Sequence, residues 1–241
     1  MKLLEEMSWP EIKAGLKVTQ TIILPVGATE EHGPHLPIFT DTIQAVEVAK
    51  EVGRLRSIFV APPVHYGVCR STRGFPGTIT VSHDSLRSYV YDILLSCYDS
   101  GFRRVMILTG HAGGQHISAL EEACQQAAGA RDFLLSMVSL FDLIDIQAVE
   151  AKGDGHAGEI ETSMMMQIRG DLVKGKPAAY FPPRPRFLIL KDVRYMMNNG
   201  IMGDPSCASL QKGKLFFDMM VQGVLEALDE LEAYAAEKQP S

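Results

Sequence analysis

Short apolar runs alternate with segments of helical spacing through the first 140 residues of the chain. The runs are rich in branched residues, which is typical of buried strands, and they lie at 20–25, 57–64, 104–108 and 133–139. Helical spacing follows Asp41 and returns at 84–100 and 115–129. This alternation predicts an α/β protein with three layers (α/β/α), in which helices cover both faces of a mostly parallel central sheet.

Length and composition indicate one domain. The chain has 241 residues, of which 46% are hydrophobic, and this is enough to enclose one large core. We therefore expect residues 1–241 to form a single domain. Beyond residue 150 the pattern is less regular, with a predicted Met-rich helix at 164–168, a short strand at 187–190 and a last helix from about 207 to 236.

Charge and hydropathy exclude several classes of partner. The net charge is −6 and no block of lysine or arginine occurs, so nucleic acid is not an expected partner. No apolar run is long enough to cross a bilayer. The N-terminus lacks the basic start and apolar core of a signal peptide, and we expect a cytoplasmic protein without a membrane partner.

The first predicted strand runs directly into a polar loop at residues 25–41. Glycine and proline make this loop irregular, so it can aim Glu30, His32 and Asp41 at one point. Carboxylate and imidazole together suit Zn, Mn or Fe. The alternative is a polar surface loop with chance histidines, because a short Glu-x-His motif does not decide the question alone.

A second polar segment follows the third strand, at Thr109-Gly110-His111-Ala112-Gly113-Gly114. It is neither a P-loop nor a dinucleotide fingerprint, and a lone histidine in such a turn is more often structural. However, both polar segments follow strands, and parallel sheets bind ligands beyond the carboxyl ends of their strands. His111 is therefore a candidate ligand together with the first loop.

A third segment places His156 just before a helix whose first turn contains two glutamates. Glu159 and Glu161 are two residues apart, so on a helix they point in different directions. We predict that Glu159 faces the site with His156. Glu161 is interpreted as a carboxylate that satisfies the free N–H groups at the helix start.

Five candidate ligands are too many for one open catalytic zinc, which usually keeps three protein ligands. Glu30, His32, Asp41, His111 and Glu159 suit two divalent metal ions that share a bridging carboxylate and activate water. His156 would pass a proton to the leaving nitrogen as the catalytic acid. This predicts metal-dependent hydrolysis of a C–N bond, and no G-x-S-x-G motif favours a serine hydrolase instead.

Five stretches resemble the creatininase (creatinine amidohydrolase) family: residues 25–37 with Thr40-Asp41, Gly74-Phe75-Pro76-Gly77-Thr78-Ile79, Thr109-Gly110-His111, residues 156–163 and Gly203-Asp204-Pro205. The resemblance implies that Glu30, His32, Asp41 and His111 are metal ligands and that Asp41 bridges two ions. It also implies a three-layer α/β fold and a homo-oligomer, commonly a hexamer. Zinc is the first expectation for both ions, with manganese or iron as alternatives.

The chain departs from the family at two places. Creatininase has a glutamate ligand two residues beyond the histidine that matches His111, where this chain has Gly113, and Glu159 is our candidate replacement. The tryptophans that help hold creatinine have no counterpart, since Trp9 is the only tryptophan. We expect a small cyclic amide or a formamide as the substrate, and Arg70 and Arg73 could meet an anionic one. The alternatives are C–C cleavage of a cyclic ketone and a non-catalytic, metal-binding relative.

Overall fold

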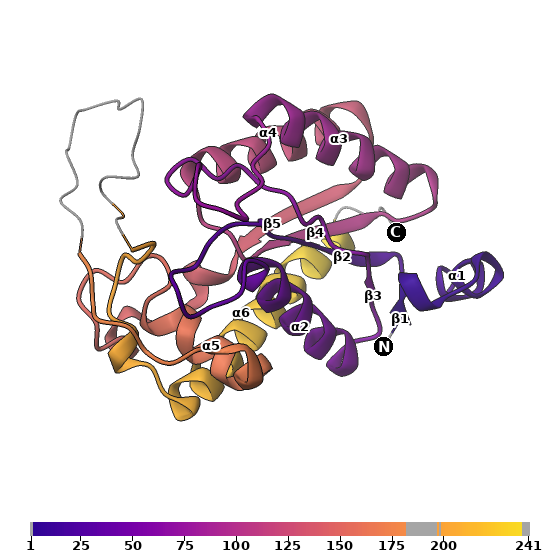
Figure 1. The fold of residues 1–241 in the computed structure, drawn as a ribbon. Coiled ribbons are helices and arrows are strands. Elements are labelled where there is room, and N and C mark those ends of the chain that lie inside the picture. Colours follow the sequence, from indigo (N-terminus) through magenta and orange to yellow (C-terminus); the bar gives the residue numbers. More distant parts are fainter. Residues whose placement is uncertain (1, 182–196, 198, 238–241) are drawn as a thin grey trace.

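A five-stranded parallel sheet runs through the centre of the molecule (Figure 1). The structure is a computed structural model that describes residues 2–181, 197 and 199–237. The strands lie in the order β1–β3–β2–β4–β5, and every adjacent pair is parallel. Their bounds are β1 (Lys2–Leu3), β2 (Thr21–Val26), β3 (Phe59–Val60), β4 (Arg104–Thr109) and β5 (Leu134–Ser139).

Helices cover both faces of this sheet, which confirms the predicted three-layer α/β/α fold (Figure 1). One face carries α2 (Thr40–Leu55), α5 (Glu159–Arg169) and α6 (Leu210–Glu237), and the other carries α3 (His83–Asp99) and α4 (Gly114–Ala130). The short α1 (Trp9–Gly15) lies at the β1 end of the sheet.

The side chains of β2 divide between two cores because successive residues of a strand point to opposite faces. Ile23 packs with α2 and α6, whereas Ile22 and Leu24 pack with α3 and α4. All three are almost completely buried. Burial on both faces explains why the strand reads as a continuous apolar run.

Two strands differ from the sequence prediction. The run at 57–64 forms only the two residues of β3, because Pro62 and Pro63 follow and have no N–H to give to the ladder. The two-residue β1, which pairs with β3, was not predicted. The strand predicted at 187–190 lies outside the described residues.

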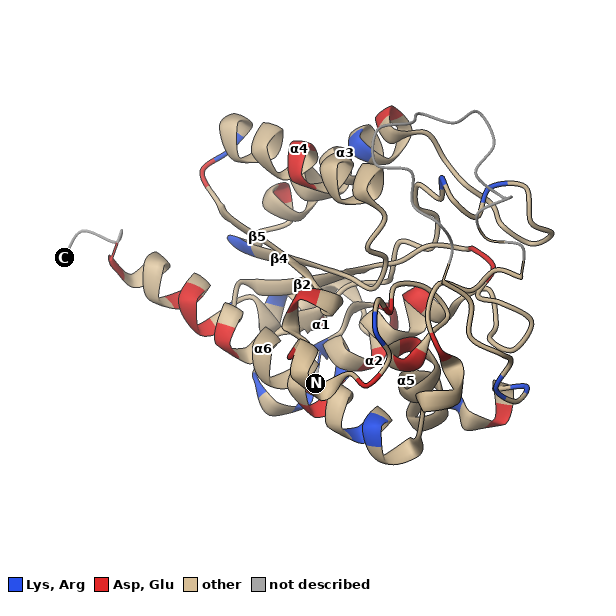
Figure 2. Cartoon of the chain, turned by 90° about the vertical axis from the view of Figure 1, so that its left-hand side faces the viewer, with Lys and Arg blue, Asp and Glu red and all other residues tan. Residues whose placement is uncertain are grey.

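The predicted Met-rich helix is α5, and the last predicted helix is α6. The C-terminal part of α6 is acidic (Figure 2). No helix within 2–181, 197 and 199–237 has both the length and the hydropathy needed to cross a membrane.

The connections after β2 and β4 leave the sheet on opposite sides. β2 leads to α2 on one face, while its neighbour β4 leads to α4 on the other. Such a reversal opens a crevice at the carboxyl ends of the two strands, where ligands of doubly wound sheets bind. Both polar segments singled out in the sequence begin at this edge.

Candidate metal centre

Two glycines bring the ends of β2 and β4 against the start of α2. A Cβ on Gly27 would lie 2.4 Å from the Thr42 hydroxyl oxygen, and one on Gly110 would lie 2.1 Å from the Asp41 carbonyl oxygen. Neither position can hold a side chain unless the backbone shifts. The close approach places Asp41, in the first turn of α2, between the two strand ends.

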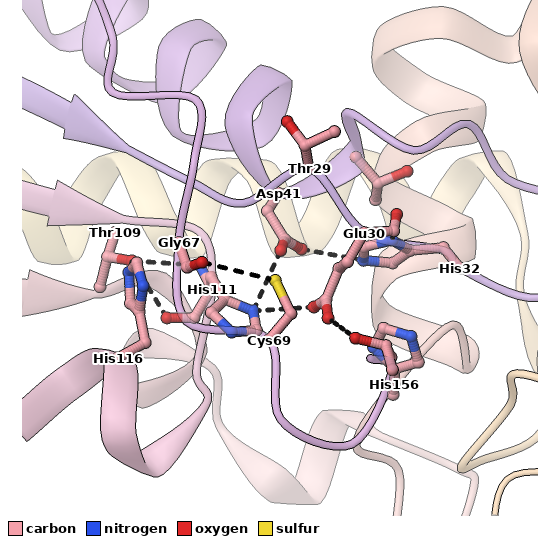
Figure 3. Close-up of polar contacts among 12 residues, drawn as sticks. Thr29, Glu30, His32, Asp41, Gly67, Cys69, Thr109, His111, His116 and His156 are labelled. Carbon is pink, nitrogen blue, oxygen red and sulfur yellow. Dashed lines mark hydrogen bonds and ion pairs between the residues drawn. The ribbon is translucent and has the colours of Figure 1, made fainter. Parts of the chain in front are cut away.

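Asp41 lies at the centre of a buried cluster of carboxylates and imidazoles (Figure 3). Its Oδ1 is 2.8 Å from His32 Nε2, and its Oδ2 is 3.0 Å from His111 Nδ1. Glu161 Oε1 is 3.4 Å from the same nitrogen of His32, and Glu30 Oε1 is 2.9 Å from the same nitrogen of His111. The two oxygens of one carboxylate therefore connect two sets of side chains.

The two histidines are held so that one particular nitrogen faces the carboxylates. His32 Nδ1 donates to the Glu30 carbonyl at 3.1 Å, and His111 Nε2 donates to the Val68 carbonyl at 3.2 Å. The other ring nitrogen of each histidine points into the cluster. Metal-binding histidines are commonly oriented in this way, because a hydrogen bond from the far nitrogen fixes the tautomer and leaves the near nitrogen free to coordinate.

The buried carboxylates and histidines of the cluster shift one another's pKa values. Burial opposes ionisation of Glu30 and Asp41, but the neighbouring histidines outweigh it, so the pKa of Glu30 falls to about 2 and that of Asp41 also falls. Burial likewise opposes protonation of His32 and His111, yet the adjacent carboxylates raise the pKa of both well above the ordinary value. The carboxylates thus favour protonated imidazoles, and the imidazoles favour ionised carboxylates.

Asp41 Oδ2 is buried and accepts no hydrogen bond within the described part of the chain, although His111 Nδ1 lies 3.0 Å away. A divalent cation between these atoms would satisfy both. Three overlapping groups have ligand atoms within 4.8 Å of one another: Glu30, Cys69 and His111; Glu30, His32 and His156; and His32, Asp41 and Glu161. The donor set therefore fits hard or borderline divalent metals.

The prediction that Glu159 faces this cluster is corrected by the structure. Its Oε1 is 2.6 Å from Lys212 Nζ, and its Oε2 accepts from the Ala151 N–H at 2.6 Å, so both oxygens are used elsewhere. Glu161, interpreted from the sequence as a helix-start carboxylate, reaches the cluster with one oxygen. Its other oxygen accepts from the Ala157 N–H, so the helix-start contact is also present.

His156 lies beside the cluster, as the sequence predicts, with its ring centroid 4.4 Å from that of His32. Its Nε2 donates to the Glu31 carbonyl at 2.8 Å and lies 3.5 Å from Glu31 Oε1. Burial and the charge of His32 lower the pKa of His156, but Glu31, Glu30 and Glu161 outweigh them and raise it. The imidazole is therefore disposed to carry a proton next to the candidate ligands.

Sequence reasoning missed two further neighbours of Glu30, namely Thr72, whose hydroxyl donates to Glu30 Oε2, and Cys69. Both come from the long connector at 65–83, where no pattern distinguishes a site residue from a loop residue. Another buried histidine, His116, has a structural role. The Thr109 hydroxyl and the Val68 N–H satisfy its ring nitrogens, and burial together with the charge of His111 lowers the pKa of His116 well below the ordinary value.

Comparison with known proteins agrees with this fold. The sequence model described as creatinine amidohydrolase matches residues 5–228. A creatinine amidohydrolase of Pseudomonas putida is 28% identical, over 93% of this chain and 95% of its own length. A mycofactocin precursor peptide peptidase of Mycolicibacterium smegmatis is 33% identical, over 86% of this chain and 83% of its own.

Solved structures give the same result in three dimensions. A mutant creatininase of the Zn–Zn type superposes with a TM-score of 0.87 at 27% identity, covering 95% of this chain and 97% of the other. A manganese creatininase gives a TM-score of 0.86 at 26% identity with the same coverage. The parallel sheet and the cluster at its carboxyl edge define a metal-dependent hydrolase of the α/β class. The chain belongs to the creatininase family.

Proposed function

We propose that the chain hydrolyses a C–N bond of a small cyclic amide or formamide, with two divalent cations at the cluster around Asp41. The observation that supports this most directly is the position of Asp41, whose two oxygens face two different sets of side chains. Glu30 and His111 would hold one cation and His32 and Glu161 the other, with Asp41 shared. When bound, such cations lower the pKa of water and polarise a carbonyl oxygen.

The residues of the chain supply orientation and proton transfer. The carbonyls of Glu30 and Val68 fix the rings of His32 and His111, so the liganding nitrogens need no rearrangement. Thr72 orients the Glu30 carboxylate in the same way. His156 donates through Nε2 to the Glu31 carbonyl, which leaves Nδ1 as the atom that gives its proton to the departing nitrogen.

A peptide C–N bond is the second candidate. It is favoured by the 33% identity to the mycofactocin precursor peptide peptidase. Cleavage of a C–C bond in a cyclic ketone is a third, since a 3-dehydro-scyllo-inosose hydrolase of Thermotoga maritima is 33% identical, although over only 44% of this chain. The same polarised carbonyl would serve each reaction.

The proposal is tested by metal analysis of the purified protein combined with a substrate panel. We expect stoichiometric zinc, manganese or iron, loss of turnover on chelation and its return with added metal. The panel contains an N-formyl amine, a five-membered cyclic amide, a short peptide and a cyclic diketone, and we expect turnover of the first two. Substoichiometric metal together with hydrolysis that survives chelation would refute the proposal.

A further inference from the structure

A polar pocket of about 340 Å³ adjoins the candidate metal centre. Its lining comes from the connector after β3 and from the starts of α3 and α4, and it comprises Val68, Cys69, Arg70, Arg73, Thr80, Val81, Ser82, His83 and Gln115. The volume is within the range of small-molecule sites. We propose that this pocket binds an oxyanion of the substrate, a phosphate or a carboxylate, through Arg70 and Arg73.

The pocket and the metal centre share a wall. Cys69 lines the pocket, and its thiol sulfur lies within 4.8 Å of ligand atoms of Glu30 and His111. Val68 also lines the pocket, and its carbonyl accepts from His111 Nε2. A molecule seated in the pocket therefore lies next to the set formed by Glu30 and His111.

The described lining of the pocket carries positive charge. It includes Arg70 and Arg73 and no aspartate or glutamate, and the nearby Asp84 and Glu122 lie against His83. Neither Arg70 nor Arg73 has a hydrogen-bond or ion-pair partner among residues 2–181, 197 and 199–237. Nearby Arg87 differs, because Gln126, Asp84 and Glu122 surround its guanidinium. Two free guanidinium groups at one pocket offer the planar fork that matches carboxylate and phosphate oxygens.

The start of α4 adds to this preference for an anion. The helix has 17 residues, no side chain caps its N-terminus, and its first turn contains no acidic residue. A Cβ on Gly114 would meet nothing within 4 Å, so the helix end is open. The positive end of its dipole thus contributes beside Gln115, which lines the pocket.

This inference rests on the proposed function, since it assigns the substrate class of the same site. It predicts that the scissile amide is joined by a short linker to a phosphate or carboxylate. The amide lies at the metal centre, and the oxyanion lies between Arg70 and Arg73.

Binding of inorganic phosphate and of acetate to the holoenzyme, measured by calorimetry, tests the pocket without any turnover. The variants are Arg70→Gln, Arg73→Gln and the double substitution, with Arg54→Gln on α2 as the matched surface control. We expect the double variant to bind one of the two anions at least about tenfold more weakly than wild type, as charge-assisted bonds are lost. Arg54→Gln should bind both anions with the affinity of wild type. Any anion that binds directly to the metal should remain bound in all variants.

Equal affinity of the wild type and the double variant for both anions would overturn the inference. The anion that loses more affinity identifies the group that the pocket prefers. Metal content and thermal unfolding should be unchanged, because both arginines are exposed and unpaired in the described chain.

Kinetics give the second readout. An N-formyl substrate that carries a phosphate or carboxylate is compared with its uncharged analogue. The double variant should show at least a tenfold higher KM for the charged substrate and the same kcat/KM for the uncharged one. An equal loss for both substrates would contradict anion recognition. Absence of any amide hydrolysis by wild type would refute the proposed function, while the calorimetric comparison would still decide whether the pocket binds an anion.

Discussion

Two acidic clusters meet at the start of α5, and they differ in how their charges are satisfied. In one, Glu159 pairs with Lys212 and a backbone N–H, while Asp154 accepts from the N–H groups of Glu159 and Ile160. In the other, the carboxylates around Asp41 face ring nitrogens of His32 and His111, and Asp41 Oδ2 accepts no hydrogen bond within the described residues. The first cluster is satisfied by groups of the protein itself, whereas the second retains a buried carboxylate oxygen that a bound cation would satisfy.

The partners of these carboxylates, and not their degree of burial, distinguish a structural carboxylate from a candidate metal ligand. Glu159 is 0% exposed and Glu161 is 5% exposed, so the more buried of the two is the structural one. What distinguishes them is the charged partner: the ammonium group of Lys212 for Glu159 and the imidazole of His32 for Glu161.

Asp41→Asn should give the largest effect, because it removes the one carboxylate that both halves of the centre share. We expect loss of bound metal and a fall in kcat of more than about 100-fold. Even substitution of a residue that only hydrogen-bonds to a metal ligand lowers metal affinity or activity by roughly 10- to 100-fold. Metal analysis and steady-state kinetics measure this. An active, metal-loaded Asp41→Asn enzyme would place the centre elsewhere.

Glu161→Gln should lose part of the bound metal and most of the activity. Its oxygen faces only the set formed by His32 and Asp41, so the set formed by Glu30 and His111 can keep its metal. Metal content per chain, measured beside Glu159→Gln as the matched control, tests this. Full metal content in Glu161→Gln and depletion in Glu159→Gln would show that Glu159, and not Glu161, is the ligand.

His156→Gln should lower kcat by about 100-fold or more while metal content stays at the wild-type level. Loss of a positioned general acid costs this much, and Nε2 of His156 is engaged with the Glu31 carbonyl and not with Asp41. Kinetics and metal analysis of the same preparation decide the matter. Depleted metal would make His156 a ligand.

Glu159→Gln should act on folding and leave the metal centre intact. Among the described residues it leaves Lys212 with Glu150 and the Cys207 carbonyl. Because Lys212 is partly exposed, we expect the loss of this charged hydrogen bond to cost about 2 kcal/mol in the free energy of unfolding. Denaturant unfolding measures the loss. A stable but metal-free variant would contradict the division between the two clusters.

Asp154→Asn should remove a pH dependence of stability. Burial raises the pKa of Asp154 to about 6 against the opposing effect of two backbone hydrogen bonds. A carboxyl group whose pKa is raised in the folded state stabilises below its unfolded pKa and loses that contribution as the pH rises toward 6. We expect the free energy of unfolding of wild type to fall by about 2 kcal/mol relative to Asp154→Asn between about pH 4 and pH 6. This is less than the shift in pKa alone would give, because Asp154 is only half-buried and solvent screens its charge.

Unfolding free energies of wild type and Asp154→Asn across this range give the difference. Parallel curves for the two proteins would show that Asp154 does not titrate there.

The sequence predicts the layers of the fold and the first four ligand candidates because both depend on local patterns. β2 and β4 are continuous apolar runs, and each ends in the segment that carries Glu30 or His111. The two-residue β1 and β3 are too short to produce a pattern, and the prolines after β3 shorten it further.

The choice between Glu159 and Glu161 could not be made from the sequence. Helical spacing relates the two glutamates to each other but not to His156. Ala157, which lies between His156 and the helix, has a φ of +49°, so the chain turns sharply before α5 begins. The partner of Glu159, Lys212, lies 53 residues away. Only the packing of α6 against α5 shows which glutamate is neutralised within the protein.

The most direct test of the central claim is a crystal structure of the protein grown with manganese, with anomalous scattering recorded to locate the ions. A two-metal centre at Asp41 predicts two peaks on either side of its carboxylate, one beside Glu30 and His111 and the other beside His32 and Glu161. Diffraction from well-occupied crystals without a peak near Asp41, or with the metal bound at Glu159, would contradict it.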